Sequence, residues 1–455
     1  MAAKQRLAAA LARIVNSPLG TGAGASGCLV VTQGTERLYD ANGQDMFIPA
    51  SDLKILTATA VLDRLGGDTK FVTSVKSASP ADRGVIAGNL YLVGGGDPDL
   101  RTSSYGGGTS AGGTTFTSLD ALALQVRESG ISEITGSVVG DDSRYDAQRI
   151  VHSWKPIYTS EGDVGPLSAL DVNDGFVPNT TTTTRPSQAG ASKSRTTSGA
   201  STGSSSTEAS NSAALSFAAA ADPASQAAQV FETLLRKDGV RVDGGARTGY
   251  APTSAVVVTS ISSATLSNEV DQMLNFSDDT AAELFTKELG YQRSHSGTTA
   301  AGTAAIREDL ASDGLPVSEM VNVDGSGLDR GDRASCDLLV DALHRAGTGS
   351  VLAKGLPVAG KSGTLSGRLI GTPAEGRVVA KTGNLDNVVS LSGFVLPQAG
   401  SPPTPALGQP LVFSLILNGP ADPVATAIAD QVAVALAQYP AIPPLRDIEP
   451  ANSGT

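Results

Sequence analysis

Segments typical of β-strands lie near both ends of this 455-residue chain, which limits how it can fold. Residues 27–32 are apolar and β-branched, and residues 36–41 follow after a Gly-Thr turn, so the two segments predict a hairpin. The C-terminal part predicts three more strands in succession, at residues 378–382, 388–396 and 411–418. We expect the C-terminal third to complete a sheet that the N-terminal hairpin begins.

Helical segments and loops occupy most of the chain between these strands. Apolar spacing predicts helices at residues 2–15, 52–65, 119–129, 226–238, 279–290 and 425–438. Residues 179–211 are low-complexity sequence rich in Ser and Thr, which predicts a flexible linker or loop. The sequence therefore predicts an α/β (α+β) fold. Residues 1–68 and 255–455 would form one domain, with a second domain of residues 69–254 inserted between them.

Charge and composition argue against several classes of function. The net charge of −12 argues against nucleic acid and anionic membrane surfaces as partners. The two cysteines, Cys28 and Cys336, are too few for a disulfide framework or a cysteine zinc site, and whether they pair is left open. The three histidines lie far apart without a His-Glu-x-x-His pattern. We therefore expect neither a metal nor an organic cofactor.

No apolar segment is long enough to cross a bilayer, so no transmembrane segment is predicted. The apolar run at residues 7–11 is also too short for the core of a signal peptide. If the protein is exported, we expect its signal to be absent from this chain.

The strongest candidate nucleophile is a serine at the start of a predicted helix. Two Gly-x-Ser-x-Gly matches, at residues 108–112 and 199–203, lack the strand-turn-helix context of a nucleophile elbow. The chain also has no histidine that suits a Ser-His-Asp triad. The sole Ser-x-x-Lys in the chain is Ser-Asp-Leu-Lys at residues 51–54. Its spacing places Ser51 and Lys54 on one helix face, where the lysine can act as a base for the hydroxyl.

The Ser-x-x-Lys motif and a second serine motif also have ordinary structural interpretations. One Ser-x-x-Lys match is expected by chance in a chain so rich in serine, and serine is a common helix N-cap. Ser277-Asp278-Asp279 opens a predicted helix, where an N-cap and acidic residues in the first turn are normal. Neither motif alone establishes an active site.

A lysine motif follows one of the predicted C-terminal strands. In Lys381-Thr382-Gly383 the lysine can supply fixed positive charge, the threonine can bind a carboxylate, and the glycine lets a ligand lie close to the strand. A competing Lys-Ser-Gly string at residues 361–363 follows only a short segment broken by glycine. We therefore favour Lys381.

The order Ser-x-x-Lys, Ser-x-x and Lys-Thr-Gly resembles that of the penicillin-recognising serine enzymes. Longer strings resemble signatures of the class C low-molecular-mass penicillin-binding proteins, the D-Ala-D-Ala carboxypeptidases and endopeptidases of the bacterial cell wall. These strings lie at residues 88–100, 135–142, 167–170, 324–330 and 371–376. The resemblance covers most of residues 5–440, except about 172–215. It implies a penicillin-binding transpeptidase/β-lactamase-like domain with an inserted domain.

The resemblance also implies the mechanism of a serine DD-peptidase. Ser51 would attack the carbonyl of the penultimate D-alanine, and Lys54 would take its proton. Ser277 would relay a proton to the nitrogen of the leaving D-alanine. Lys381 would supply positive potential, and Thr382 would bind the terminal carboxylate. Water would then release the acyl group from the enzyme.

Further expectations follow from the same resemblance. The backbone N–H groups of Ser51 and Asn384 would form the oxyanion hole, and Gly383 would lie against the substrate. Peptidoglycan stem peptides would be the substrates, and β-lactam antibiotics would acylate the enzyme as mimics of D-Ala-D-Ala. The resemblance implies no cofactor, and it implies an extracytoplasmic location.

Stem-peptide side chains are contacted by the inserted domain in this family. The matching stretches here contain Trp154, Tyr158, Glu161, Asp163 and Arg330. A carboxylate at this place would suit the amine of diaminopimelate or lysine. A surface loop with one buried tryptophan explains the same residues equally well.

Two positions depart from the pattern of the family. Asp279 stands where asparagine is usual. An ionised Asp279 would favour protonated Lys54 and so weaken the general base, and it lacks the N–H donor of an asparagine. Asn384 stands where threonine is common, which would weaken recognition of the substrate carboxylate.

Two other functions compete with a DD-peptidase. One is a penicillin-binding scaffold of low turnover, whose site Asp279 has weakened. The other is a β-lactamase or esterase on the same fold, although Ser51 and Ser277 lie much further apart in sequence than the matching serines of class A β-lactamases. Carboxypeptidase and endopeptidase activities use the same atoms on different leaving groups, so both stay open.

Overall fold

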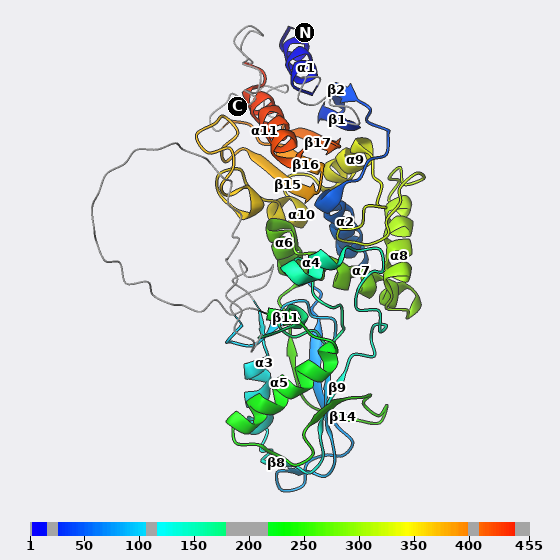
Figure 1. Cartoon of the computed structure of the whole chain (residues 1–455), viewed down its shortest axis with the longest axis vertical. Helices are drawn as coiled ribbons and strands as arrows, with labels where there is room; N and C mark the ends of the chain where they lie inside the picture. The colour runs from blue at the N-terminus through cyan, green and yellow to red at the C-terminus, as the bar shows by residue number, and fades with distance from the viewer. Residues whose placement is uncertain (1, 16–25, 106–115, 179–216, 399–408, 442–455) are drawn as a thin grey trace, which may run out of the picture.

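The computed structural model describes residues 2–15, 26–105, 116–178, 217–398 and 409–441. Two five-stranded sheets lie toward opposite ends of the molecule, and helices lie between them (Figure 1). The linker predicted at residues 179–211 falls outside the described residues.

The first sheet joins the two ends of the chain, as the strand pattern predicts. Its order is β15 (Val378–Leu385), β16 (Val388–Val395), β17 (Leu411–Asn418), β1 (Ser26–Gln33) and β2 (Glu36–Ala41), with antiparallel neighbours. Helices α1 (Ala2–Val15) and α11 (Asp422–Gln438) pack on one face, whereas α2 (Leu53–Leu65) and α9 (Cys336–Ala346) belong to the core of the other. Every residue of β16 is buried, because both faces of the sheet are covered.

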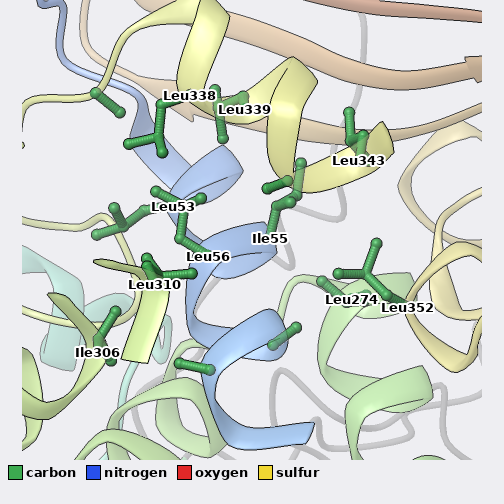
Figure 2. Packing of buried hydrophobic residues seen from close by; sticks show 14 of the residues in the cluster. Leu53, Ile55, Leu56, Leu274, Ile306, Leu310, Leu338, Leu339, Leu343 and Leu352 are labelled. Carbon is green, nitrogen blue, oxygen red and sulfur yellow. The ribbon is translucent and has the colours of Figure 1, made fainter. Parts of the chain in front are cut away.

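Helix α2 lies at the centre of an apolar core. Its residues from Leu53 to Val61 are all buried, and several neighbouring helices pack against it (Figure 2). These neighbours are α6 (Leu266–Phe276), α7 (Asp279–Ser294), α8 (Thr299–Ser312), α9 and α10 (Val351–Gly355). Truncating Leu56 to alanine would cost about 2–5 kcal/mol of stability. The residues at the N-terminal end of α2 therefore stand on a rigid support.

The second sheet has a core of its own. Its order is β13 (Ala246–Thr248), β9 (Val138–Asp141), β5 (Leu90–Val93), β3 (Val72–Ser77) and β14 (Val256–Ser262). Helices α3 (Leu119–Glu128) and α5 (Pro223–Lys237) share a separate apolar cluster with it. The remaining short strands are β4 (Val85–Ile86), β6 (Leu100–Arg101), β7 (Thr117–Ser118), β8 (Glu133–Ile134), β10 (Phe176–Pro178), β11 (Phe217–Ala219) and β12 (Arg241–Val242). The separate core supports the two-domain division, which stays a prediction.

A disulfide links the first sheet to the helical core. Cys28 of β1 and Cys336 of α9 are bonded, with their Cα atoms 6.0 Å apart. Both side chains are buried in the core around α2. The pairing, which the sequence left open, thus fixes α9 against the sheet.

The structure corrects two local predictions at the motifs. Strand β15 extends beyond the predicted end at residue 382 and includes Gly383, because it stays paired with β16 as far as Leu385. Ser51 lies in a 3₁₀ turn that precedes α2 rather than in the helix itself. Among the described helices, none is long and apolar enough to cross a membrane.

Candidate active site

Ser51 lies in the turn before α2, directly beside β15. A Cβ atom at Gly383 would lie 2.9 Å from the Ser51 nitrogen and 2.2 Å from Ser390 Oγ, so only glycine fits there. Strand β16 fixes the same turn, because Ser390 Oγ donates to the Pro49 carbonyl at 2.7 Å. The packing of β15 and β16 therefore sets the position of Ser51.

Lys54 is fully buried one helical turn after Ser51. Its Nζ atom donates to Ser51 Oγ at 3.0 Å, to Asp279 Oδ1 at 2.5 Å and to the Ser326 carbonyl at 2.8 Å. An ammonium group has three N–H donors, so these acceptors use its full capacity. The geometry suits a lysine that exchanges a proton with Ser51.

The segment that joins α6 to α7 brings two more predicted residues to this place. Ser277 has a φ of 62°, in the left-handed region, and its backbone nitrogen closes the end of α6. Asp278 caps α7, because its side chain accepts a hydrogen bond from the Ala281 nitrogen. Burial raises the pKa of Asp279 to about 6, and the charge of Lys54 opposes this rise.

Lys381 is the second buried lysine of the site. Its Nζ atom donates to the Thr382 carbonyl at 2.7 Å. Burial lowers its pKa to about 7, with a further contribution from Lys54, whereas Asp52 and Asp279 act in the opposite direction. The competing Lys361 is 57% exposed and forms an ion pair with Glu375. Of these two lysines, Lys381 is the buried one.

A cavity of about 690 Å³ lies beside these residues. The predicted residues that line it near the nucleophile are Ser51, Ser277, Asp279, Thr382, Gly383 and Asn384. Three more predicted residues line it from α4 (Pro156–Glu161) and the loop that follows, namely Tyr158, Glu161 and Asp163. Burial and the neighbouring Glu161 raise the pKa of Asp163. The predicted motifs and part of the predicted stem-peptide contact thus meet in one place.

The structure places the other two predicted substrate contacts outside the cavity lining. Trp154 is buried, and its Nε1 atom donates to Asp324 Oδ2 at 2.8 Å. Arg330 donates to the Asp386 carbonyl at 2.8 Å. Trp154 supports a buried loop next to the site, because its indole N–H needs a partner once it is buried.

Several residues of the site were not predicted. The Ser326 carbonyl contacts Lys54, and Thr364 and Arg368 line the cavity. Ser326 belongs to one of the family-like strings, and Thr364 follows directly on the rejected Lys-Ser-Gly string. These strings were the available signals, but neither shows which atoms point toward the site.

Two other expectations concern serine motifs and metals. Both Gly-x-Ser-x-Gly matches, at residues 108–112 and 199–203, lie outside the described residues. In the part of the chain that the structure describes, no group of three or more His, Cys, Asp or Glu side chains is arranged to bind a metal.

Comparison with known proteins gives concordant matches. The model of the D-Ala-D-Ala carboxypeptidase 3 (S13) family matches residues 7–214 and 196–439. A D-alanyl-D-alanine carboxypeptidase of an Actinomadura species is 34% identical over 94% of this chain and 83% of its own length.

Solved structures agree with the fold. Penicillin binding protein 4 of Haemophilus influenzae matches with a TM-score of 0.72 and 20% identity, over 94% of this chain and 98% of that one. Its complex with a β-lactam matches with a TM-score of 0.68 and 20% identity, over 92% and 98% of the two chains. On the family match and the identity to the Actinomadura enzyme, the chain belongs to the D-Ala-D-Ala carboxypeptidase 3 (S13) family.

Proposed function

We propose that Ser51 is the nucleophile of this serine-type D-Ala-D-Ala carboxypeptidase and that Lys54 is its general base. The observation that carries this proposal is the 3.0 Å hydrogen bond from Lys54 Nζ to Ser51 Oγ, beside a cavity that Ser277 and Thr382 also line. A serine hydroxyl needs such a base, because it is a weak nucleophile while it keeps its proton.

The reaction has two stages. Lys54, in its amine form, takes the proton of Ser51 Oγ as the oxygen attacks the carbonyl of the penultimate D-alanine. The backbone N–H groups of Ser51 and Asn384 stabilise the negative oxygen. Ser277 then relays the proton held by Lys54 to the leaving nitrogen, the C–N bond breaks, and D-alanine departs. Water hydrolyses the ester on Ser51, which restores the enzyme.

Charge around the cavity orients the substrate. Lys381 supplies positive potential from its buried position, and Thr382 binds the terminal carboxylate of the substrate. Gly383 allows β15 to lie against the turn of Ser51, because any side chain there would collide with that turn. Removing a preorganised charge or donor of this kind typically costs about a hundredfold or more in rate.

The side chain of the stem peptide would lie toward α4. Tyr158, Glu161 and Asp163 line this part of the cavity. Their two carboxylates suit the amine of diaminopimelate or lysine. Trp154 and Arg330 would act indirectly, through Asp324 and the Asp386 carbonyl, rather than by touching the peptide.

Peptidoglycan stem peptides and β-lactams are therefore the expected ligands. The matched Haemophilus influenzae protein has been solved with a β-lactam, which supports acylation of Ser51 by the same class of compound. Substrates of this kind place the enzyme outside the cytoplasm. The disulfide between Cys28 and Cys336 supports this location, because such bonds persist in oxidising compartments.

One observation favours a second candidate, a penicillin-binding scaffold of low turnover. Asp279 Oδ1 lies 2.5 Å from Lys54 Nζ, where a neutral asparagine is usual in similar enzymes. An ionised carboxylate at this distance favours the ammonium form of Lys54, which cannot accept the proton of Ser51.

Labelling with a fluorescent penicillin, followed by peptide mapping, tests the proposal. We expect a stable adduct on Ser51 that is absent from Ser51→Ala. Release of D-alanine from a stem-peptide mimic then separates an enzyme from a scaffold, which would be acylated without turnover. Rapid multiple turnover of nitrocefin would instead favour a β-lactamase. No adduct on Ser51 at any pH, in the wild type or in Asp279→Asn, would refute the assignment of the nucleophile.

A further inference from the structure

A row of buried polar side chains crosses the face of the first sheet that packs toward α2. Lys381 of β15 pairs with Ser392 of β16, and Ser392 pairs with Ser414 of β17, so the three side chains share one face. All three are fully buried. Phe394, on the same face, belongs to the apolar core around α2. Polar groups in such a layer need partners within it, because burial removes them from water.

Asp52 adds a carboxylate to this row. It directly follows the proposed nucleophile in the 3₁₀ turn Ala50–Asp52, and its side chain is fully buried. Its Oδ2 atom lies 2.5 Å from Ser392 Oγ, which lies 2.8 Å from Ser414 Oγ. A hydroxyl has one proton, so Ser392 donates to the ionised carboxylate and accepts from Ser414. The carboxylate is therefore held next to the cross-strand neighbour of Lys381.

The charges in this part of the site balance as two buried lysines and two buried carboxylates. Lys54 of α2 forms an ion pair with Asp279 of α7. Lys381 donates to a backbone carbonyl and forms no ion pair among the described residues. Burial and the charge of Lys54 lower the pKa of Lys381, whereas Asp52 and Asp279 raise it. Because Asp279 is already paired, Asp52 is the carboxylate left to balance Lys381.

We infer that Asp52, held by Ser392, is a positioning residue that keeps Lys381 charged during the reaction. This inference rests on the proposed function, in which Lys381 supplies positive potential. Burial raises the pKa of Asp52 to about 7, and the hydrogen bond from Ser392 and the charge of Lys381 oppose this rise. The carboxylate and the ammonium group each favour the charged form of the other, so they titrate as a linked pair.

Asp52→Asn tests the inference, because an amide of the same shape still accepts from Ser392 but carries no charge. The readout is the rate constant of Ser51 acylation by a penicillin, measured from about pH 5 to 9. We expect the alkaline decline of this rate to move to lower pH by about one unit or more, since the ammonium group loses a nearby opposite charge. The rate at about pH 8 should fall by about tenfold, whereas the rate at about pH 5.5 should stay within about twofold.

Three further variants separate an effect of charge from a loss of packing. Ser392→Ala removes the donor to Asp52 and should shift the decline in the same direction by a smaller amount. Thr59→Val should leave the decline unchanged, because this buried threonine of α2 donates only to the Ile55 carbonyl, at 2.8 Å. In a Lys381→Arg background, Asp52→Asn should cause no shift, because arginine stays charged throughout this range.

The outcomes separate this inference from the proposed function. No acylation of Ser51 in the wild type or in Asp279→Asn refutes the proposed function. An acylated wild type with the same alkaline decline as Asp52→Asn overturns the role of Asp52 alone. An equal shift in the Lys381→Arg background would show that Asp52 acts on another group, which also contradicts the inference. If Asp52→Asn does not fold, Ser392→Ala decides, and an unshifted decline in that variant is the contrary result.

Discussion

Lys54 Nζ lies 2.5 Å from Asp279 Oδ1, closer than the 3.0 Å that separates it from Ser51 Oγ. The amine proposed to activate the nucleophile is thus bound most closely by a carboxylate. Burial raises the pKa of Asp279 to about 6 against the opposing effect of Lys54, so the carboxylate is ionised above that pH. In this range it favours the ammonium form of Lys54 and opposes proton transfer from Ser51.

We expect Asp279→Asn to raise the acylation rate near pH 7 by about tenfold, because a neutral amide no longer favours the ammonium form. Below about pH 6 the wild-type carboxyl takes up a proton, so the rates of wild type and variant should converge there. Penicillin acylation measured from about pH 4 to 9 checks this. Asp386→Asn, an exposed carboxylate of the same cavity, is the matched control. An unchanged profile in Asp279→Asn would contradict the argument.

Lys381 and Lys361 give a paired test of the third motif. Lys381→Ala should slow acylation of Ser51 by about a hundredfold or more, because it removes a buried charge next to the reacting groups. Lys361→Ala should change the rate by less than about twofold, because Lys361 forms only an exposed ion pair with Glu375. Equal effects of the two substitutions would show that Lys381 has no special role.

Lys381 also predicts how the acylation rate changes with pH. Burial lowers its pKa to about 7, so its charge is lost as the pH rises through that value. We expect the acylation rate to decline on the alkaline side for this reason. Replacement by arginine, which stays charged, should flatten that decline. A decline of the same size in Lys381→Arg would assign it to another group.

Local periodicity in the sequence predicts the sheet and the helices, but it does not predict which residues line the cavity. Residues 388–396 and 411–418 are continuous apolar segments, and they form β16 and β17 almost as predicted. A short, continuous apolar segment of this kind is typical of a buried strand. The third strand was predicted to end at residue 382, whereas β15 continues to Leu385. Pairing with β16, a long-range interaction, continues β15 through these residues.

The remaining site residues could not be predicted, because the sequence does not show in which direction a side chain points. The resemblance placed Trp154 on the substrate, whereas its indole N–H faces the buried Asp324. Thr364 was not considered, because the Lys-Ser-Gly string before it follows only a short segment broken by glycine, yet the turn of Gly363 brings its hydroxyl to Thr382. Both outcomes depend on contacts between segments far apart in the sequence, which motif spacing does not contain.

The disulfide predicts a large effect on stability. Cys28 and Cys336 are separated by 308 positions, so the bond closes a long loop between the first sheet and α9. The double variant Cys28→Ala/Cys336→Ala should lose about 2–5 kcal/mol of stability. Thermal unfolding with and without reductant checks this, and reductant should not affect the double variant. Acylation per folded molecule should stay at the wild-type level, and a wild-type Tm insensitive to reduction would contradict the prediction.

Glu283 is linked to the proposed base through the backbone of Ser326. It is fully buried on α7, four residues after Asp279, so both carboxyls lie on one helix face. Its Oε1 atom accepts hydrogen bonds from the nitrogens of Gly325 and Ser326 at 2.9 and 2.7 Å. The Ser326 carbonyl in turn accepts from Lys54 Nζ at 2.8 Å. We therefore expect Glu283 to be a positioning residue for Lys54.

Glu283→Leu should lower the rate constant of acylation by about a hundredfold while the noncovalent affinity for penicillin stays near the wild-type value, because Lys54 shifts relative to Ser51. Glu283→Gln should restore most of the rate, since one amide oxygen can accept both hydrogen bonds. Burial, aided by Asp324, raises the pKa of Glu283 to about 8, so a neutral side chain suits the site. Saturation kinetics of acylation give the acylation rate constant and the noncovalent affinity separately.

Glu288→Leu, at another buried glutamate of α7, should lower Tm without changing the acylation rate constant. A glutamine variant as slow as the leucine variant would show that the charge of Glu283, rather than its hydrogen bonds, is required.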